Sequence, residues 1–325
     1  MNYIFSCNSN YVMPFTVCLA SIFENNREEK INVYLLYDKL SDQEFSIISN
    51  FVKSYNQRID FIKVEDKYFH DAPVFRWTKE AYFRLLMGDI LPSTIDRVLY
   101  LDVDIIVNKP LKDLYNMDLG DSYMAALREK DLEKTTRVRL GLSESGKYFQ
   151  SGVLLCDLRK CRLLLRYANV EKVIGYLKLK GEFTVDQDVI NVIFDGNIKE
   201  IDPKFNNCEI TKFGGNKLNR LLNRIDQNEL SNTHVFHYSL SKPWNKTFSG
   251  SCEFLWNKYL LLSPFKNLYK RKYGSLKYRL LRSGFIKLIF FKYIDLTPHI
   301  NNFAKNIFKD DKYTRLKNFY RQNIK

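Results

Sequence analysis

Apolar segments alternate with segments of helical spacing through the first 107 residues, and this alternation constrains the fold more than any other feature. The sequence Ser-Asp-Gln-Glu at 41–44 has the form of a capping box that opens one of the helices. Strands joined through helices form right-handed crossovers, so they lie parallel in one sheet. We predict strands at 2–7, 31–37, 59–64 and 97–107, and helices that end near residues 24, 55 and 88.

The later sequence adds less regular elements. We expect strands near 122–128, 149–158 and 234–239, and helices at 159–180, 184–194 and 252–262. The chain is therefore predicted to be an α/β protein, with a Rossmann-like domain whose sheet is mixed and mainly parallel. Its 325 residues, 45% of them hydrophobic, are enough to bury one large core.

The positive charge is concentrated at the end of the chain. Residues 264–325 hold sixteen lysines and arginines but only three aspartates, which gives them +13 of the total formal charge of +14. We therefore divide the chain into a globular domain at 1–263 and a basic α-helical region at 264–325. Thirteen aromatic residues lie among these charges, a mixture typical of an anionic membrane interface. The alternatives are a basic helix packed on the domain by its apolar side, and a nucleic-acid-binding segment.

The cysteines and apolar runs argue against several classes of protein. The six cysteines form no Cys-x-x-Cys pair, which disfavours a zinc site or a disulfide framework, and we expect them to be reduced and buried. No run approaches the roughly 20 apolar residues that span a bilayer. The first residues do not resemble a secretory signal, so we expect a cytoplasmic protein.

Two aspartates interrupt the apolar run YLDVDIIV at 100–107. Because alternate residues of a strand point to opposite sides, Asp102 and Asp104 are expected to share one face near the strand's carboxyl end. Open α/β sheets bind ligands at this end, and two buried carboxylates need a cation, for which Mg²⁺ or Mn²⁺ is suited. The alternative is that one aspartate caps a turn while the other pairs with a lysine.

His237 is the candidate for a third ligand. It lies in a strand-like Phe-His-Tyr of a chain with only four histidines. Taken alone, such a histidine is more often a hydrogen-bonded residue of the core. An imidazole beside two carboxylates favours Mn²⁺ over Mg²⁺.

Eight segments of the chain follow the order found in a known family. They are IFSCNSNY, AYFRLLMGDILP, RVLYLDVDIIV, LKDLYNMDLGD, YFQSGVLLCDL, VDQDVINVIF, PKFN and HYSLSKPW, and together they cover about residues 1–260. In these segments the chain resembles the bacterial glycosyltransferase family 8 enzymes, which include lipopolysaccharide and lipooligosaccharide galactosyl- and glucosyltransferases. The resemblance implies a GT-A type catalytic domain at 1–263 that binds a nucleotide-sugar.

The resemblance also implies a reaction. It is a retaining, Mn²⁺-dependent transfer of a hexose from UDP-glucose or UDP-galactose to a saccharide acceptor, such as a lipid-linked lipopolysaccharide. An enzyme with this acceptor is expected at the inner face of the membrane, held there by the basic region, and no nucleic acid is expected as a partner. The alternatives are a non-catalytic relative that binds a nucleotide-sugar, and a basic nucleic-acid-binding protein.

Carried over residue by residue, the resemblance makes Asp102, Asp104 and His237 the metal ligands. It places Gln187 and Asp186 at the donor sugar as catalytic residues. Because Gln187 is a poor nucleophile, this arrangement favours a same-face displacement in which the leaving phosphate oxygen accepts the acceptor's proton. The residues implied to contact the nucleotide-sugar are Ser6, Cys7, Asn8, Asn10, Tyr11, Arg84, Asp102, Val103, Asp104, Gln150 and Lys242.

Some of these residues also have structural explanations. Tyr11 is implied to stack on the uracil, but it could instead pack at the start of a helix. Arg84 could be a solvated cation on an amphipathic helix, and Asp186 could cap the helix that begins near residue 184.

Three positions depart from the family pattern. Asn8 stands where an aspartate is common, and Gln150 stands where an asparagine is frequent. The segment HYSLSKPW is one residue shorter than usual and lacks its glycine, which leaves open how Lys242 approaches the diphosphate.

Overall fold

The computed structural model describes residues 1–65, 67–75, 77–181, 183–211, 227–245 and 252–268. Apart from 264–268, the predicted basic region lies outside the described residues. None of the helices in the described ranges is long and apolar enough to cross a membrane. All six cysteines are free and buried, as expected from the sequence.

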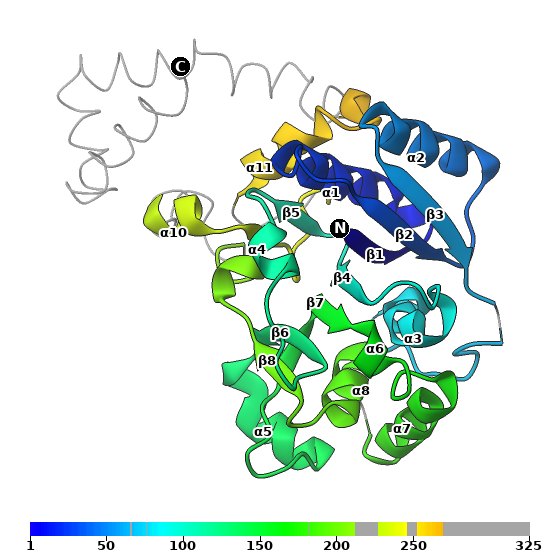
Figure 1. Cartoon of the computed structure of the whole chain (residues 1–325), viewed down its shortest axis with the longest axis vertical. Helices are drawn as coiled ribbons and strands as arrows, with labels where there is room; N and C mark the ends of the chain where they lie inside the picture. Colours follow the sequence, from blue (N-terminus) through cyan, green and yellow to red (C-terminus); the bar gives the residue numbers. More distant parts are fainter. Residues whose placement is uncertain (66, 76, 182, 212–226, 246–251, 269–325) are drawn as a thin grey trace, which may run out of the picture.

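A seven-stranded sheet forms the centre of the protein, with strand order β3-β2-β1-β4-β7-β6-β8 (Figure 1). The first four strands are mutually parallel where they pair, β7 runs antiparallel to both of its neighbours, and β8 runs parallel to β6. The mixed, mainly parallel α/β sheet predicted from the sequence is thus confirmed. The strands are β1 (Asn2–Cys7), β2 (Asn32–Tyr37), β3 (Arg58–Lys63), β4 (Arg97–Leu101), β6 (Met124–Arg128), β7 (Phe149–Asp157) and β8 (Ile198–Glu200).

Apolar side chains of the strands face both sides of this sheet, so there are two cores. Tyr3 and Phe5 of β1 enter one core, and Ile4 enters the other. In Figure 1, α1 (Val12–Asn25), α2 (Asp42–Ser54) and α11 (Glu253–Leu260) lie on the first side. The second side carries the 3₁₀ helix η2 (Lys79–Leu86) and α3 (Met87–Ile90), α6 (Leu158–Cys161), α7 (Tyr167–Leu179) and α8 (Val185–Ile193).

Five further helices lie in the described residues. They are η1 (Ser9–Tyr11), α4 (Lys112–Tyr115), α5 (Lys130–Leu140), η3 (Pro203–Phe205) and α10 (Gln227–Asn232).

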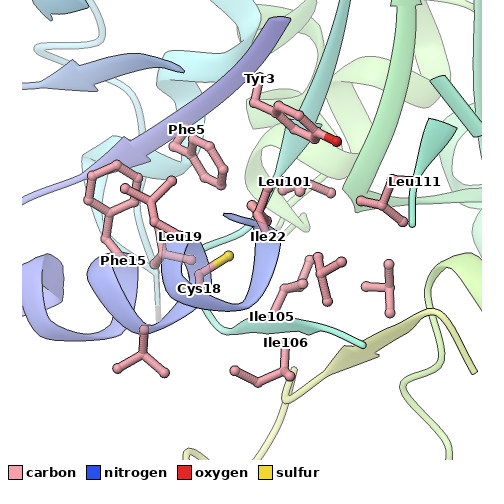
Figure 2. Close-up of a cluster of buried hydrophobic side chains, with 14 of the residues drawn as sticks. Tyr3, Phe5, Phe15, Cys18, Leu19, Ile22, Leu101, Ile105, Ile106 and Leu111 are labelled. Atoms are coloured by element: carbon pink, nitrogen blue, oxygen red, sulfur yellow. The ribbon is translucent and has the colours of Figure 1, made fainter. Parts of the chain in front are cut away.

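A second, two-stranded sheet pairs β5 (Ile105–Val107) with β9 (Val235–His237) in antiparallel register. Figure 2 shows side chains of α1, among them Leu19 and Ile22, packed between β1 and β5. The hydroxyl of Ser21 accepts a hydrogen bond from the Val107 amide at 2.9 Å, so α1 also satisfies backbone groups of β5. The chain therefore leaves the main sheet directly after β4 and enters the small sheet at β5.

Several predicted elements differ in detail. The apolar run at 97–107 is not one strand, because it is divided into β4 and β5 by a turn at 102–104. The predicted helix at 159–180 is two helices, since the Asp89 carboxylate of α3 accepts from the Tyr167 amide at 2.7 Å and starts α7 separately. The helix expected at 77–88 is mostly 3₁₀. Neither β8 nor α5 was predicted, whereas the capping box of Ser41 and Glu44 is confirmed.

Arg162 holds the connection between α3 and β4 in place. This connection comes shortly after η2, the helix that carries Arg84. The Arg162 guanidinium donates to four backbone carbonyls, those of Gly88, Leu91, Pro92 and Ile95, at 2.6 to 3.1 Å. A planar group with five donors can serve several acceptors at once. Gly88 belongs to the short helix α3, whose last carbonyls have no acceptor role within the helix, so the guanidinium supplies a donor there.

We predict that Arg162→Met lowers the free energy of unfolding by about 2 to 3 kcal/mol, because it leaves several carbonyls with no charged donor. The measurement is urea denaturation followed by circular dichroism. The matched control, Lys172→Met on the exposed side of α7, should change stability by less than about 0.5 kcal/mol. Equal midpoints for the two variants would contradict this role of Arg162.

Candidate functional site

Asp102 and Asp104 lie in the turn between β4 and β5, and not on one face of a strand as the sequence pattern suggested. The last contact of this chain segment with β7 is the hydrogen bond from the Asp102 amide to the Gly152 carbonyl at 2.9 Å. Val103, between the aspartates, is buried in the core on the α1 side. The turn still brings both carboxylates to one place, at the carboxyl end of β4.

His237 reaches these carboxylates through the β5–β9 pairing, in which it stands opposite Ile105. Its Nε2 lies 3.2 Å from Asp104 Oδ1 and 3.7 Å from Asp102 Oδ2. Burial lowers the pKa of His237, but Cys208 and Asp104 outweigh burial and hold that pKa above its ordinary value. A divalent cation would take the place of this proton.

The three side chains fit a divalent metal ion. One ligand atom from each of Asp102, Asp104 and His237 can be chosen so that all lie within 4.8 Å of one another. Asp104 Oδ1 is buried and faces His237 Nε2 at 3.2 Å, so a cation that replaced the imidazolium proton would keep this buried charge compensated. A Cβ atom on Gly152 would lie 2.3 Å from His237 Cε1 and 2.9 Å from Asp102 Oδ2. Glycine at this position therefore leaves room for the ligand set.

Lys242 adds a cation to the same group. Its ammonium contacts Asp104 Oδ2 directly and donates to the carbonyls of Tyr238 and Ser239 at 2.8 and 3.1 Å. The shortened loop after His237 thus still brings Lys242 to the aspartate turn. Burial lowers the pKa of Lys242, but Asp104 outweighs that effect, so the side chain stays charged.

Arg84 is buried, which rules out the interpretation of a solvated helix cation. Its guanidinium lies 2.8 Å from Asp102 Oδ1 and 3.2 Å from Asp186 Oδ2, and donates to the Ser151 carbonyl at 2.6 Å. It also stacks 4.1 Å from the ring centre of Tyr100, whose hydroxyl donates to Asp102 Oδ1. One arginine therefore orients a metal-site carboxylate and Asp186 together.

The cluster sets the protonation of its carboxylates. Burial raises the pKa of Asp104, but Lys242 and His237 outweigh burial and hold that pKa below the ordinary value. At Asp186 burial is the larger effect, and it raises the pKa to about 6 although Arg84 lowers it. Asp104 is therefore ionised at neutral pH, whereas the pKa of Asp186 lies close to neutral.

Gln187 and Arg84 both form hydrogen bonds with the backbone of Ser151 in β7. Gln187 Oε1 accepts from the Ser151 amide at 3.2 Å, and Gln187 Nε2 donates to the Tyr148 hydroxyl at 3.0 Å. Asp188, rather than Asp186, accepts from the Thr184 amide at the start of α8, so the predicted capping alternative for Asp186 is wrong.

The end of β1 and the loop that follows it contain the predicted residues Ser6, Cys7, Asn8, Asn10 and Tyr11, of which Ser6 and Cys7 are buried. Asn8 accepts from the Asn10 amide at 3.0 Å, a contact that an aspartate would make equally well. The Tyr11 ring meets the edge of Trp244, two residues after Lys242, with 6.1 Å between ring centres. This contact joins the loop to the segment that carries Lys242.

Sequence reasoning missed several residues that complete the site. Gly152 and Ser151 follow Gln150 in the segment YFQSG, whose glycine was a usable signal. Asn206 belongs to the segment PKFN, and its Oδ1 lies 2.8 Å from His237 Nδ1. Nothing in the local sequence around Asn206 indicates this long-range contact.

Comparison with known proteins assigns the chain to a family. The sequence profile of glycosyl transferase family 8 matches residues 2–248. The chain belongs to glycosyl transferase family 8. Within this family it is similar to a lipopolysaccharide 1,2-glucosyltransferase of Escherichia coli, with 26% identity over an alignment of 304 positions that covers 86% of each chain. A lipopolysaccharide 1,3-galactosyltransferase of Salmonella typhimurium is 25% identical over 75% of this chain and 73% of its own length.

Solved structures show the same fold as this family 8 chain. The galactosyltransferase LgtC, crystallised with donor and acceptor sugar analogues, matches it with a TM-score of 0.69 and 22% identity, over 81% of this chain and 96% of LgtC. The glycosyltransferase GlyE of Streptococcus pneumoniae matches with a TM-score of 0.59 and 21% identity, over 84% of this chain and 63% of GlyE. The predicted GT-A type architecture is thus confirmed.

We predict that Gly152→Ala in this family 8 protein weakens Mn²⁺ binding by about 10- to 100-fold, the usual cost of displacing a metal ligand's support. The added methyl group would push the His237 ring away from the aspartates. Calorimetric titration with Mn²⁺ measures this change.

The matched control is Gly175→Ala on α7, where a Cβ meets no atom within 4 Å. It should leave Mn²⁺ affinity unchanged and gain up to about 1 kcal/mol of helix stability. A Gly152→Ala protein that binds Mn²⁺ as tightly as the wild type would show that this contact does not shape the site.

Proposed function

We propose that this family 8 glycosyltransferase transfers glucose or galactose from a UDP-sugar to a saccharide acceptor, with retention of configuration and with Mn²⁺ at Asp102, Asp104 and His237. The observation that carries the proposal is the convergence of these three ligands, from two distant segments, beside buried Arg84 and Lys242. Two carboxylates and an imidazole suit Mn²⁺. The acceptor proposed is a lipopolysaccharide-type glycan, since the similar enzymes of Escherichia coli and Salmonella typhimurium are named for it.

Residues around the proposed metal site would have distinct roles in sugar transfer. Bound Mn²⁺ would supply positive charge where the leaving diphosphate becomes more negative. Lys242 would add a second cation on that side, released in part from Asp104 when the phosphate binds. Arg84 keeps Asp102 and Asp186 in place, so its role is to hold the site's geometry through sugar transfer.

Retention is proposed to proceed by same-face displacement. A covalent route needs a carboxylate free to attack the sugar. Asp186 is buried and paired with Arg84, while Asp188 is fully buried and bound by Arg139, Tyr148 and the Thr184 amide. These bonds hold both carboxylates away from a nucleophilic role. The leaving phosphate oxygen would then accept the acceptor's proton, with the amide of Gln187 beside the cationic sugar.

The non-catalytic alternative is disfavoured by the same contacts. The reason to consider this alternative was the shortened HYSLSKPW segment. In the structure, however, Lys242 still contacts Asp104, and His237 still faces both aspartates. The shortened segment therefore gives no reason to prefer a binding protein over an enzyme.

The direct test is release of UDP from a panel of UDP-sugars, with Mn²⁺ and with a chelator. We expect slow hydrolysis of UDP-glucose or UDP-galactose, abolished by the chelator. Asp104→Asn should lower the rate by two orders of magnitude or more, because metal charge stabilisation is worth several kcal/mol.

Asp121→Asn, at an exposed carboxylate, is the matched control and should keep the wild-type rate. Circular dichroism should show that both variants are folded. If Asp104→Asn released UDP as fast as the control, the proposed metal-dependent transfer would be wrong.

We further propose that the basic region at 264–325 attaches the enzyme to an anionic membrane surface, near a lipid-linked acceptor. The full chain should co-sediment with vesicles of phosphatidylglycerol but not with vesicles of phosphatidylcholine alone, and added salt should weaken the binding. Tighter binding to duplex DNA or RNA than to the anionic vesicles at equal salt would favour the nucleic-acid alternative instead.

A further inference from the structure

We propose that Glu129, Gln150 and Asn206 form a directional chain of hydrogen bonds that fixes His237 in the tautomer able to bind a metal. They are positioning residues, because they act on the metal site through His237. The inference rests on the proposed metal site and assigns to Gln150 a role different from lining the donor sugar.

The chain of contacts is continuous from the edge of the site to the imidazole. Gln150 Nε2 donates to Glu129 Oε2, and Asn206 Nδ2 donates to Gln150 Oε1 at 3.0 Å. Asn206 Oδ1 then lies 2.8 Å from His237 Nδ1. Asn206 is fully buried, and Gln150 and Glu129 are partly buried, so water competes least at the end nearest the metal site.

The carboxylate at the far end decides the direction of every bond. An ionised carboxylate only accepts, so Gln150 must turn its NH₂ group toward Glu129. The carbonyl of Gln150 then faces Asn206, which must present its own NH₂ group to it. The Asn206 carbonyl is thereby aimed at His237, and only a protonated Nδ1 can pair with it.

The consequence is a free electron pair on the other ring nitrogen. With the proton on Nδ1, neutral His237 turns an unprotonated Nε2 toward Asp104 and Asp102, where a cation would bind. The opposite tautomer would set two lone pairs against each other across 2.8 Å. The Cys208 thiol, 3.4 Å from His237 Nδ1, is a weak donor and does not offset that repulsion.

The fold brings these residues together from separate segments. The Asn207 carbonyl accepts from the His237 amide at 3.2 Å, and Asn207 forms a parallel bridge with Phe236, which places Asn206 next to the imidazole. The pairing of β6 with β7 is irregular after Ala126, and the Glu129 amide then donates to the Tyr148 carbonyl at 2.7 Å. This irregularity sets Glu129 beside Gln150.

Four variants test the chain of hydrogen bonds. Asn206→Leu removes the acceptor for Nδ1, and Asn206→Asp keeps an acceptor there. Glu129→Gln is isosteric but removes the group that sets the direction. Cys208→Ala removes the thiol that lies 3.4 Å from His237 Nδ1, 3.4 Å from Gln150 Oε1 and 3.8 Å from Asn206 Oδ1, so it measures what the thiol, rather than the amides, contributes.

Two measurements apply to each variant, on the full chain and without donor substrate. The first is Mn²⁺ affinity by calorimetry. The second is the ¹⁵N spectrum of His237, assigned with a His237→Gln sample and recorded in the presence of Mg²⁺. This diamagnetic cation replaces the proton between Nε2 and the two aspartates, so the spectrum reports the Nδ1–H form independently of activity.

We expect Asn206→Leu to weaken Mn²⁺ binding by about 10- to 100-fold and to give a mixture of tautomers. Asn206→Asp should keep the Nδ1–H tautomer and most of the affinity, Glu129→Gln should show a smaller loss together with some of the second tautomer, and Cys208→Ala should match the wild type. If Asn206→Leu fails to fold, Glu129→Gln decides the question.

The inference is overturned if Asn206→Leu or Glu129→Gln keeps a single Nδ1–H tautomer with wild-type Mn²⁺ affinity. Failure of the proposed metal site has a different signature. In that case the tautomer changes as expected in the variants, but the wild type and Asp104→Asn bind Mn²⁺ equally weakly.

Discussion

Antiparallel pairing of β5 with β9 holds His237 beside two aspartates that lie more than 130 residues earlier in the chain. The pairing positions Ile105 opposite His237, so the residue directly before β5, Asp104, faces the imidazole. The Tyr238 amide continues the ladder to the Asp104 carbonyl at 3.0 Å. Without this small sheet, the carboxylates at the end of β4 would have no imidazole partner.

The same constraint explains the density of charge around the turn at 102–104. Three buried or partly buried carboxylates, Asp102, Asp104 and Asp186, are matched by Arg84, Lys242 and His237. Burying such groups is costly, and replacement by apolar residues often costs nothing in stability. The arrangement therefore favours a functional explanation, in which a cation and a diphosphate enter a site whose opposing charges are already in place.

The sequence predicted the main sheet well, because parallel strands buried on both faces are uniformly apolar and the helices between them are amphipathic or capped, as at Ser41. It did not predict that the run at 97–107 would divide. From Val98 to Val107 the run is apolar except for the aspartates, and the groups that hold β5 away from the main sheet, such as Ser21 of α1, are remote in the chain. The burial of Arg84 and the contact of Asn206 with His237 depend on tertiary packing in the same way, so periodicity carries no signal for them. The aspartates and His237 were found because residue chemistry and family resemblance pointed to the same three positions.

The account depends on a metal ion bound where β4, β5 and β9 meet. The most direct measurement is X-ray diffraction from crystals grown with Mn²⁺ and UDP, with data collected on both sides of the manganese absorption edge. The account predicts one strong anomalous peak within bonding distance of carboxylate oxygens of Asp102 and Asp104 and of His237 Nε2, with the diphosphate on its open side. A peak at another place, or UDP bound with no manganese beside these residues, would contradict it.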